Sequence, residues 1–544
     1  MSEQSKQKGR MAKDTIIYML AKGIEGVVGI ATMSVMTVLF VPELMGHYST
    51  VNIAITTIGM VCIQWLVQSV MRYINKYQIE KKETSFYTTV FLAWAKSNIL
   101  GLVCTPLLIL AALAVMHVLS VVITLLFGGG FTWASKLSFE VMSGKISRII
   151  TPLLMLLAGL WFVTYNTAQL VIAMLAALRK AKLNLLLSMI TVCGRLALMC
   201  LFCKLWGSRV EWIFLSYFIT DGVVSLIGLL NLQVFKYLNA KNGSKEIQNE
   251  LRSYGMPLMG NMITTSVLNK SDIYIISGLL GFGMAGIYQT NYSLIATAFT
   301  LLSASVMRGS YPTILRTWSE GKKELTEQLI SEAVRFYLLL SVPAVLGVAS
   351  VSDVVARALF EAKYFEGNTI MFWVALGMMF LGLTEYSIKH WELNANTTAI
   401  FKRSLIGGIV NVGLNLVFIR VFGSYYVAAV TTFIGFFVYF LLARFGTRKY
   451  MKWHVPLLSY VRIIGSGLLM FAALMLLKKY GLSFENLNGA LAAVHGGAAF
   501  SEKIVNLTRV LLLVLIGAVL YGILLLTSGE VKSEVKAILA KIHI

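Results

Sequence analysis

Charged residues are scarce in this chain, and acidic residues are the scarcest. Only 13% of the 544 residues are charged, and 25 Asp and Glu stand against 47 Lys and Arg. Soluble domains carry about 25% charged residues, so the composition excludes a soluble protein. Apolar runs recur along the whole chain, which is 57% hydrophobic with a mean hydropathy of +0.76. Strand-like alternation is absent, so the pattern predicts an all-α protein that crosses the membrane many times.

Cysteine and histidine are also rare, at 5 and 6 residues. No spacing of these residues is typical of a metal site. Phosphate-binding glycine loops and the HExxH and GxSxG motifs are absent as well. We therefore expect no metal, no cofactor and no enzymatic activity. All five cysteines lie inside apolar runs and are expected to fill lipid-facing or core positions without forming disulfides: Cys62, Cys104, Cys193, Cys200 and Cys203.

The apolar runs predict about fourteen membrane-spanning helices. The first run is too long for the core of a signal peptide, so it is expected to be retained as a helix. The third run is too long for one upright span and is expected to bend at Pro106 or to begin along the membrane surface. The predicted spans are Ile16–Phe40, Tyr48–Met71, Phe86–Phe127, Ile149–Leu178, Leu183–Leu205, Trp212–Phe235, Tyr254–Leu280, Gly286–Tyr311, Leu329–Val351, Ile370–Leu393, Ser404–Phe422, Tyr425–Ala443, Leu457–Leu477 and Ile504–Leu526.

Basic residues cluster in alternate loops of this predicted topology. If the N-terminus is cytoplasmic, most Lys and Arg fall in cytoplasmic segments, as the positive-inside rule requires. The net charge of +22 is then a signal of topology, and nucleic-acid binding is not expected. Both termini are predicted to be cytoplasmic. The clusters are Arg72, Lys76, Lys81 and Lys82; Arg179, Lys180 and Lys182; Lys236, Lys241 and Lys245; and Arg444, Arg448, Lys449 and Lys452.

Two parts of the chain repeat each other. The segment LFVPELMGHYSTVNIAI at 39–55 is similar to LLGFGMAGIYQTNYSLI at 279–295, with Gly46 aligned to Gly286. Two six-helix halves in the same order imply parallel repeats, a common plan of transporters in which the substrate path runs between the halves. The predicted domains are a first six-helix bundle at 1–240, a second at 241–450, and a region at 451–544 with two additional helices and an amphipathic cytoplasmic tail.

Two predicted spans carry charges within their apolar runs. On the seventh span, Lys270 and Asp272 lie two positions apart and so face different sides, beside a polar arc that includes Asn269. The first span carries Lys22 and Glu25 on a similar polar stripe. A charge that faces lipid costs at least about 2.5 kcal/mol, so both stripes are expected to face a watery cavity or another helix. The alternative is that these charges snorkel or make structural bonds between helices.

Two further groups of charged residues have possible partners nearby. In the segment at 384–394, TEYSIKHWELN, Glu385 and Lys389 have the spacing of a pair along one helix. A structural or gating role is expected for this segment. Arg195 and Asp221 are candidates for a pair between neighbouring helices of the first half, although their spacing does not show it.

Several motifs together resemble those of polysaccharide flippases, the polysaccharide-transporter (Wzx-type) branch of the multidrug/oligosaccharidyl-lipid/polysaccharide superfamily. They are DTIIYMLAKGIEG, VPELMGHYS and QSVMRYINKY in the first half, and YGMPL, SDIYIISGLLGFGMAGIY and YPTILRTWSEGKKE in the second. The resemblance extends from Met11 to Arg448. It implies two six-helix bundles that move lipid-linked glycans by alternating access. Lipid II flippases of the same superfamily also have two extra helices, which there line a groove for the lipid tail, so lipid II is an alternative substrate.

The resemblance implies a polyprenyl-(pyro)phosphate-linked oligosaccharide, moved across the bacterial inner membrane for cell-envelope polysaccharide biosynthesis. Lys and Arg can replace the hydration of its phosphate by charge-assisted hydrogen bonds. We therefore expect a cationic cavity that binds the headgroup, with two arginines near its cytoplasmic mouth. Membrane lipids and a polysaccharide polymerase or synthase are the expected partners. The candidate substrate-binding residues are Lys22, Lys270, Asn269, Arg72, Arg308 and Arg335.

Acidic residues in membrane helices are the usual sites of coupling ions, which favours Glu25 and Asp272 for this role. Asn411 and Asn415, one turn apart, could add oxygen ligands for sodium or make hydrogen bonds between helices. A multidrug/cation antiporter is the less favoured transport alternative, because a cavity that carries lysine repels cations. A membrane glycosyltransferase or polymerase would need clustered carboxylates, often on a sizeable loop, and the chain lacks them.

Overall fold

The computed structural model describes residues 23–103, 151–178, 180–239, 242–394, 396–488 and 501–532. Within these ranges the chain is helical and contains no strand. Ten of the described helices are long and apolar enough to span a membrane. Four further helices lie at predicted spans: Gly23–Leu39, the helix that begins at residue 83, α9 (Lys245–Leu279) and α10 (Phe282–Ser319). The predicted all-α polytopic class is confirmed, whereas the predicted number of fourteen spans stays a prediction.

Contacts divide the chain into two compact units. Unit 1 comprises Met1–Gly286 and Ile419–Gly423, and unit 2 comprises Ile287–Phe418 and Ser424–Ile544. The sequence repeat places α9 at the start of the second bundle, whereas its contacts group α9 with unit 1. The domain boundaries at residues 240 and 450 were predicted from the sequence repeat, and they stay a prediction.

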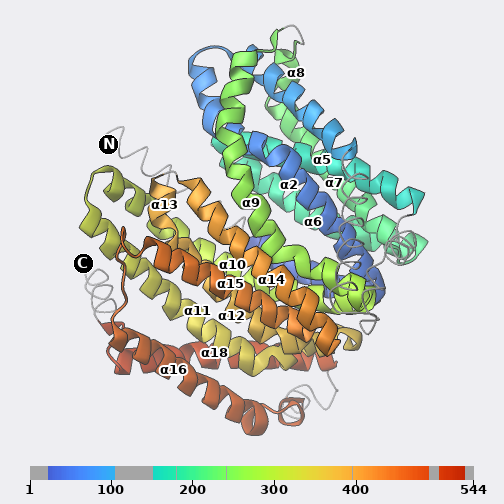
Figure 1. Ribbon diagram of the computed structural model, residues 1–544. Helices are drawn as coiled ribbons and strands as arrows, with labels where there is room; N and C mark the ends of the chain where they lie inside the picture. The colour runs from blue at the N-terminus through green and yellow to red at the C-terminus, as the bar shows by residue number, and fades with distance from the viewer. Residues whose placement is uncertain are drawn as a thin grey trace, which may run out of the picture. The chain divides into compact units, whose positions relative to one another are not determined.

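Unit 1 is a bundle of long helices (Figure 1). Besides α9, it contains α2 (Pro42–Ile79), α5 (Pro152–Ala177), α6 (Ala181–Trp206), α7 (Val210–Asn231) and the short α8 (Val234–Tyr237). α5 packs against both α2 and α7, α6 packs on α7, and α9 lies along α2. Trp161 of α5 is buried in this core, with ring centroids of Phe214 and Tyr217 at 5.4 and 5.3 Å from its own.

Local sequence sets the ends of these helices. Thr151 caps α5, since its hydroxyl accepts a hydrogen bond from the Leu154 amide at 3.1 Å, and Pro152 fills the first helical position. α6 ends at Gly207, whose φ of +83° is a conformation that glycine adopts without strain. Ser244 caps α9 in the way that Thr151 caps α5. The caps lie at the ends of the bundle, so each span runs uninterrupted between them.

Unit 2 contains most of α10 and the later helices, except the last residues of α14, which belong to unit 1. They are α11 (Lys323–Leu359), η3 (Ala362–Ile370), α12 (Met371–Ser387), α13 (Lys389–Leu393), α14 (Thr397–Phe422), α15 (Tyr426–Thr447), α16 (Leu457–Leu476), η4 (Leu477–Gly481) and α18 (Glu502–Thr527). The predicted span Ile370–Leu393 is therefore wrong at its end, because the helix breaks after Ser387. There the carbonyl of Ser387 accepts a hydrogen bond from Thr447 Oγ1 of α15 at 3.0 Å, while the Trp391 amide bonds to Ile388.

The two additional helices pack on α11. α16 and α18 contact each other, and both lie along α11 (Figure 1). Near the end of α16, Lys478 pairs with Asp353 of α11 at 2.9 Å. Just beyond α18, the carboxylate of Glu530 is 2.6 Å from Arg335 Nε of α11 and 3.6 Å from Arg462 Nη1 of α16. Ion pairs thus hold this helix pair to α11 at both ends. Most of the predicted amphipathic tail lies outside the described residues.

Candidate functional site

Lys270 lies where α9 faces α2 within unit 1. Its side chain is half-buried, and its Nζ donates a hydrogen bond to Thr56 Oγ1 of α2 at 3.3 Å. About two turns further along α9, Ser277 Oγ is 3.3 Å from Thr50 Oγ1 of α2. The polar stripe predicted on this span therefore faces another helix on at least one side. The same contact keeps open the alternative of a structural bond between helices.

The other predicted residues of the polar stripes differ in burial. Asp272 is almost completely buried, at 1% exposure, whereas Asn269 and Glu25 are half-buried. Lys22 lies outside the described residues, and the side chain of Arg308, on α10, lies outside the described side chains.

The far end of α2 carries the predicted Arg72 on its surface. Its guanidinium lies over the ring of Tyr254 of α9, 4.4 Å from the ring centroid. One turn further, Lys76 Nζ is 2.6 Å from Glu250 Oε1, and Tyr77 donates a hydrogen bond to the same carboxylate. Arg72 is thus an exposed cation held against an aromatic face, a placement that suits binding of a phosphate.

The predicted Arg335 has a different environment from Arg72. Its guanidinium bonds the side chain and the backbone carbonyl of Glu530, and so links α11 to the end of the additional helix pair. This contact is an anchor within unit 2.

The two repeated segments meet in a close backbone contact. A Cβ atom at Gly46 would lie 2.0 Å from the carbonyl oxygen of Phe282, and one at Gly286 would lie 1.9 Å from that of Pro42. Each glycine opposes the carbonyl four positions before the other glycine, so the contact is reciprocal. The rings of His47 and Phe282 pack edge to face beside it, 4.7 Å apart. Only glycine permits so close an approach of two backbones.

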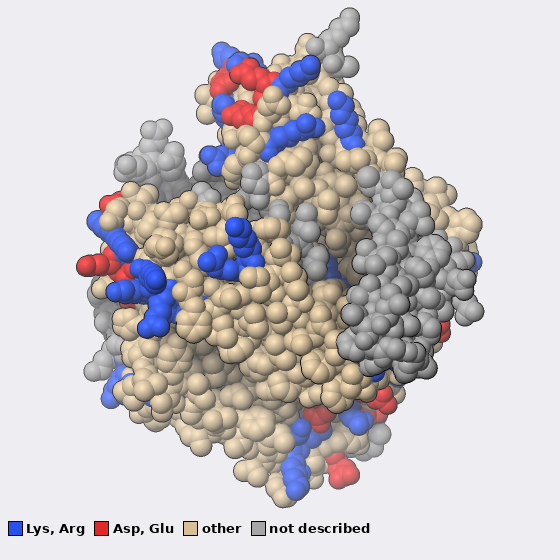
Figure 2. Space-filling view, viewed as in Figure 1, with Lys and Arg blue, Asp and Glu red and all other residues tan. Residues whose placement is uncertain are grey.

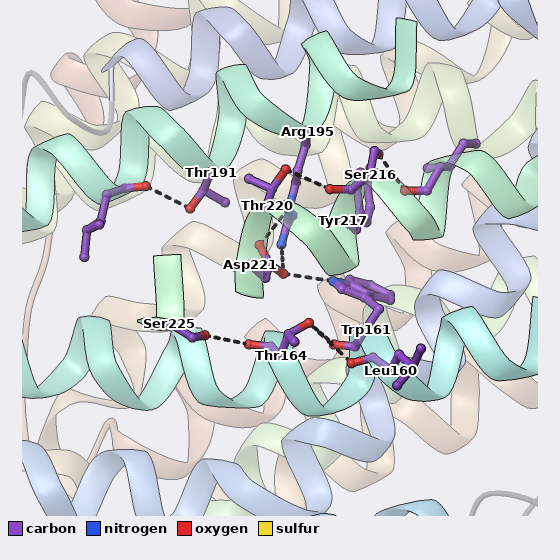
Figure 3. Close-up of polar contacts among 12 residues, drawn as sticks. Leu160, Trp161, Thr164, Thr191, Arg195, Ser216, Tyr217, Thr220, Asp221 and Ser225 are labelled. Carbon is purple, nitrogen blue, oxygen red and sulfur yellow. Dashed lines mark hydrogen bonds and ion pairs between the residues drawn. The ribbon is translucent and has the colours of Figure 1, made fainter. Parts of the chain in front are cut away.

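An ion pair with a fully buried carboxylate links α6 to α7 (Figure 3). Arg195 Nε and Nη2 donate to the two carboxylate oxygens of Asp221 at 3.1 and 2.5 Å, and Trp161 Nε1 donates at 2.9 Å. The ring of Tyr217 lies 4.5 Å from the guanidinium, and its hydroxyl is 2.9 Å from that of Tyr48 on α2. The pair considered from the sequence is confirmed. Its aromatic partners were missed, because no spacing relates residues on four separate helices.

The predicted pair of Glu385 with Lys389 is not a direct ion pair in the structure. Lys389 is buried and pairs with Glu392 at 2.5 Å, and its Nζ lies 4.7 Å from the ring centroid of Tyr311. The i, i+4 geometry assumed a continuous helix. The break after Ser387 removes that geometry, because it lies between Glu385 and Lys389.

In unit 2, a network of neutral polar side chains joins α14 to α15. Asn411 Nδ2 donates to Thr432 Oγ1 at 3.0 Å, and Asn415 Nδ2 donates to Asn411 Oδ1 at 3.4 Å. Thr431 donates a further hydrogen bond to Asn415 Oδ1. Both asparagines are fully buried. The interhelical hydrogen bonds predicted as one alternative are therefore present. The amide and hydroxyl oxygens of the network are also the type of ligand that a hard cation prefers.

Neither metal ligation nor disulfide bonding is seen in the described part of the chain. Among its residues, no three or more His, Cys, Asp and Glu side chains are grouped to hold a metal. The four described cysteines are free, and Cys104 lies outside the described residues.

Solved structures of membrane transporters share this fold. The lipid II flippase MurJ in its inward closed conformation aligns with a TM-score of 0.63 and 14% identity, over 96% of this chain and 100% of that one. A MATE protein in complex with MaD3S aligns with a TM-score of 0.52 and 14% identity, over 81% and 95%. A MOP superfamily transporter from Pyrococcus furiosus aligns at 0.50 and 12%, over 81% and 95%. At these identities the likeness shows the fold alone.

Sequence families give a more direct assignment. No curated protein matches the chain. Residues 11–318, more than half of the chain, match the model of a family described as polysaccharide biosynthesis protein. This match covers the first-half motifs and the second-half motifs up to α10, and it confirms the resemblance to the polysaccharide-transporter branch. The chain therefore belongs to the polysaccharide biosynthesis protein family.

Proposed function

We propose that the protein moves a polyprenyl-(pyro)phosphate-linked oligosaccharide across the bacterial inner membrane for cell-envelope polysaccharide biosynthesis. Family membership supports a role in this biosynthesis, and the fold shared with MurJ and MATE proteins supports transport. The observation that carries the proposal is Lys270, a half-buried lysine on a long helix that bonds a second helix. An ammonium in this position suits a phosphate that has lost its water, and it disfavours the cationic drugs of an antiporter.

The headgroup would be bound by residues of the two polar stripes. Lys270 and Lys22 would bind the phosphate oxygens, and the amide of Asn269 would add a hydrogen bond. Arg72, exposed at the far end of α2, would attract the headgroup from the cytoplasm. Arg308 has the same proposed role. Arg335 is the weakest member of the set, because its guanidinium already bonds Glu530.

Transport would be driven by an ion gradient through alternating access. Glu25 and Asp272 are the proposed carboxylates for coupling, with Asn411 and Asn415 as oxygen ligands. Asp221 is not in this set, because three protein donors already occupy its two oxygens. Flipping in sealed vesicles should follow a proton or sodium gradient and should lose that dependence in Asp272→Asn. Transport that ignores both gradients and the membrane potential would exclude coupling.

Mass spectrometry of copurifying lipids tests the substrate class. We expect a polyprenyl-phosphate glycan with the parent protein and loss of that lipid from Lys22→Ala and Lys270→Ala. Lys402→Ala is the matched control, because Lys402 is exposed on α14. The phosphate-binding role fails if the lipid persists equally in all four proteins. Absence of any such lipid from the parent, together with no flipping in vesicles, would overturn the function.

Lipid II is the second candidate substrate. The observation that favours it is the alignment with MurJ, which covers 96% of this chain, including the additional helix pair, and 100% of that one. The same spectra distinguish the two substrates, since lipid II carries a peptide on its sugar and an oligosaccharide precursor does not. A polysaccharide polymerase or synthase is the proposed partner in the first case.

A further inference from the structure

A polar cavity lies at the end of unit 1 where several helices begin or end. Its volume is about 410 Å³, within the range of about 300–1,000 Å³ of small-molecule sites. It is lined by four segments of unit 1. They are the end of α2, the start of the helix at residue 83, the turn from α5 to α6 and the segment from α7 to α8. Seven of its nine lining residues carry polar side chains. They include Gln78, Glu83, Lys180, Asn231, Gln233 and Tyr237.

Three of the polar side chains have no hydrogen-bond partner among the described residues of the protein. Gln78, Glu83 and Gln233 make no side-chain hydrogen bond or ion pair with other described residues. Gln233 also has a φ of +51°. A residue other than glycine rarely adopts this left-handed conformation, and such residues concentrate at functional positions. Two amides and a carboxylate are therefore available to a ligand.

The remaining polar groups are held in place by neighbours. Lys180 Nζ is 2.8 Å from Asn231 Oδ1, which joins the start of α6 to the end of α7. The rings of Tyr87 and Tyr237 stack at 5.3 Å with an interplanar angle of 17°. The stacked tyrosine rings fix one wall of the cavity, whereas Lys180 and Asn231 are exposed to solvent.

The chemistry of the lining selects one class of ligand. One carboxylate and one ammonium balance in charge, so the cavity lacks the positive excess that a phosphate requires. Only two leucines supply aliphatic lining, which is too little for a hydrophobic drug. Amides can donate and accept at neighbouring hydroxyl groups, and a tyrosine ring can contact the apolar face of a pyranose. These properties fit a neutral sugar.

The cavity lies at the end of the bundle that is predicted to be cytoplasmic. In Figure 2, Lys and Arg side chains surround a small group of acidic side chains at the end of unit 1 that carries α8. We propose that this cavity binds a neutral sugar of the lipid-linked glycan on the cytoplasmic side and so selects among glycans before transport. This inference rests on the proposed function, and it adds a specificity site outside the polar stripes that hold the headgroup.

Saturation-transfer NMR on the full chain in nanodiscs tests the cavity directly. The probes are glucose, galactose, rhamnose, N-acetylglucosamine and the oligosaccharide released by mild acid from the copurifying lipid. We expect binding of at least one of them, and at least about tenfold weaker binding in Gln78→Leu/Gln233→Leu, because each lost hydrogen bond contributes about 1 kcal/mol. Asn249→Leu, at an exposed amide of α9 outside the cavity, should bind like the parent. Inorganic phosphate should not displace the sugar.

The outcomes separate this inference from the proposed function. If no probe binds the parent, if the double variant binds equally well, or if phosphate competes, the sugar site is overturned. A polyprenyl-linked glycan that still copurifies in those cases leaves the proposed function standing. Sugar binding that depends on Gln78 and Gln233, without any copurifying lipid-linked glycan or flipping, would support the site and overturn the function.

Discussion

Polar side chains buried between helices are charged at one interface of unit 1 and neutral at one interface of unit 2. In unit 1, α6 and α7 are joined by the charged pair of Arg195 and Asp221. In unit 2, α14 and α15 are joined by the neutral side chains of Asn411, Asn415 and their threonine partners. A buried charge that loses its partner costs far more than a buried amide. Substitution of Asp221 should therefore destabilise the protein more than substitution of Asn411 or Asn415.

Replacing Asp221 with Ala should destabilise the protein by about 3–5 kcal/mol. The substitution leaves the Arg195 guanidinium without its carboxylate, with 23% of that side chain exposed, and leaves Trp161 Nε1 without an acceptor. Thermal unfolding in nanodiscs measures the effect. Glu80→Ala is the control, because Glu80 and Lys82 form an exposed pair at 3.4 Å. A similar change in melting temperature for the two variants would contradict the assignment of a buried pair.

At the scale of elements, a close approach in unit 1 is the reciprocal contact of Gly46 and Gly286 with the carbonyls of Phe282 and Pro42. The start of α2 and the start of α10 can lie this close only because neither glycine has a side chain. The contact thus depends on the absence of a Cβ atom at one position in each of the two repeated segments.

Gly286→Ala should cost about 1–3 kcal/mol, because the new methyl group would force the two helix starts apart. Gly283→Ala, three residues earlier on α10, is the matched control, since nothing lies within 4 Å of its Cβ position. The control should be neutral or stabilising by up to about 1 kcal/mol. Melting temperatures of the two variants test the contact. Equal effects would show that the backbones are not in contact in the membrane.

The additional helices should loosen from α11 when Glu530 loses its charge. Glu530→Gln removes the ion pairs with Arg335 and Arg462 while keeping the size of the side chain. Hydrogen exchange should become faster at the end of α18 and stay unchanged at the other end of the pair, where Lys478 and Asp353 remain paired. Glu485→Gln, an exposed position, should change nothing. Unchanged exchange in Glu530→Gln would remove the anchoring role.

At the scale of the whole molecule, the distribution of Lys and Arg predicts both termini in the cytoplasm. A fluorescent protein fused after Ile544 should be fluorescent, because it folds in the cytoplasm. Alkaline phosphatase fused after Gly207 or Gly423, in the predicted external breaks, should be active. Activity of a phosphatase fused after Ile544 would reverse the orientation, and it would place the polar cavity of unit 1 on the external side.

Fold class and spans were predictable because each depends on a short stretch of sequence. An apolar run of about 20 residues must become a helix in the membrane, whatever it packs against. The repeat was also predictable from short stretches of sequence, since Gly46 and Gly286 lie in similar segments. The end of the predicted span Ile370–Leu393 was not predictable, because a side chain of α15 takes the carbonyl that would have continued the helix.

For the candidate site, too, the sequence predicted some features and only the structure showed others. Composition and spacing identified Lys270 and Asp272 as charged residues of a membrane helix, because lipid makes such charges costly wherever they occur. Their partners depend on the rotation and tilt of each helix, which are set by packing and not by hydropathy. Tertiary structure alone therefore decided that Lys270 meets Thr56, that Asp221 is held by Arg195 and Trp161, and that a polar cavity forms where the helix ends of unit 1 converge.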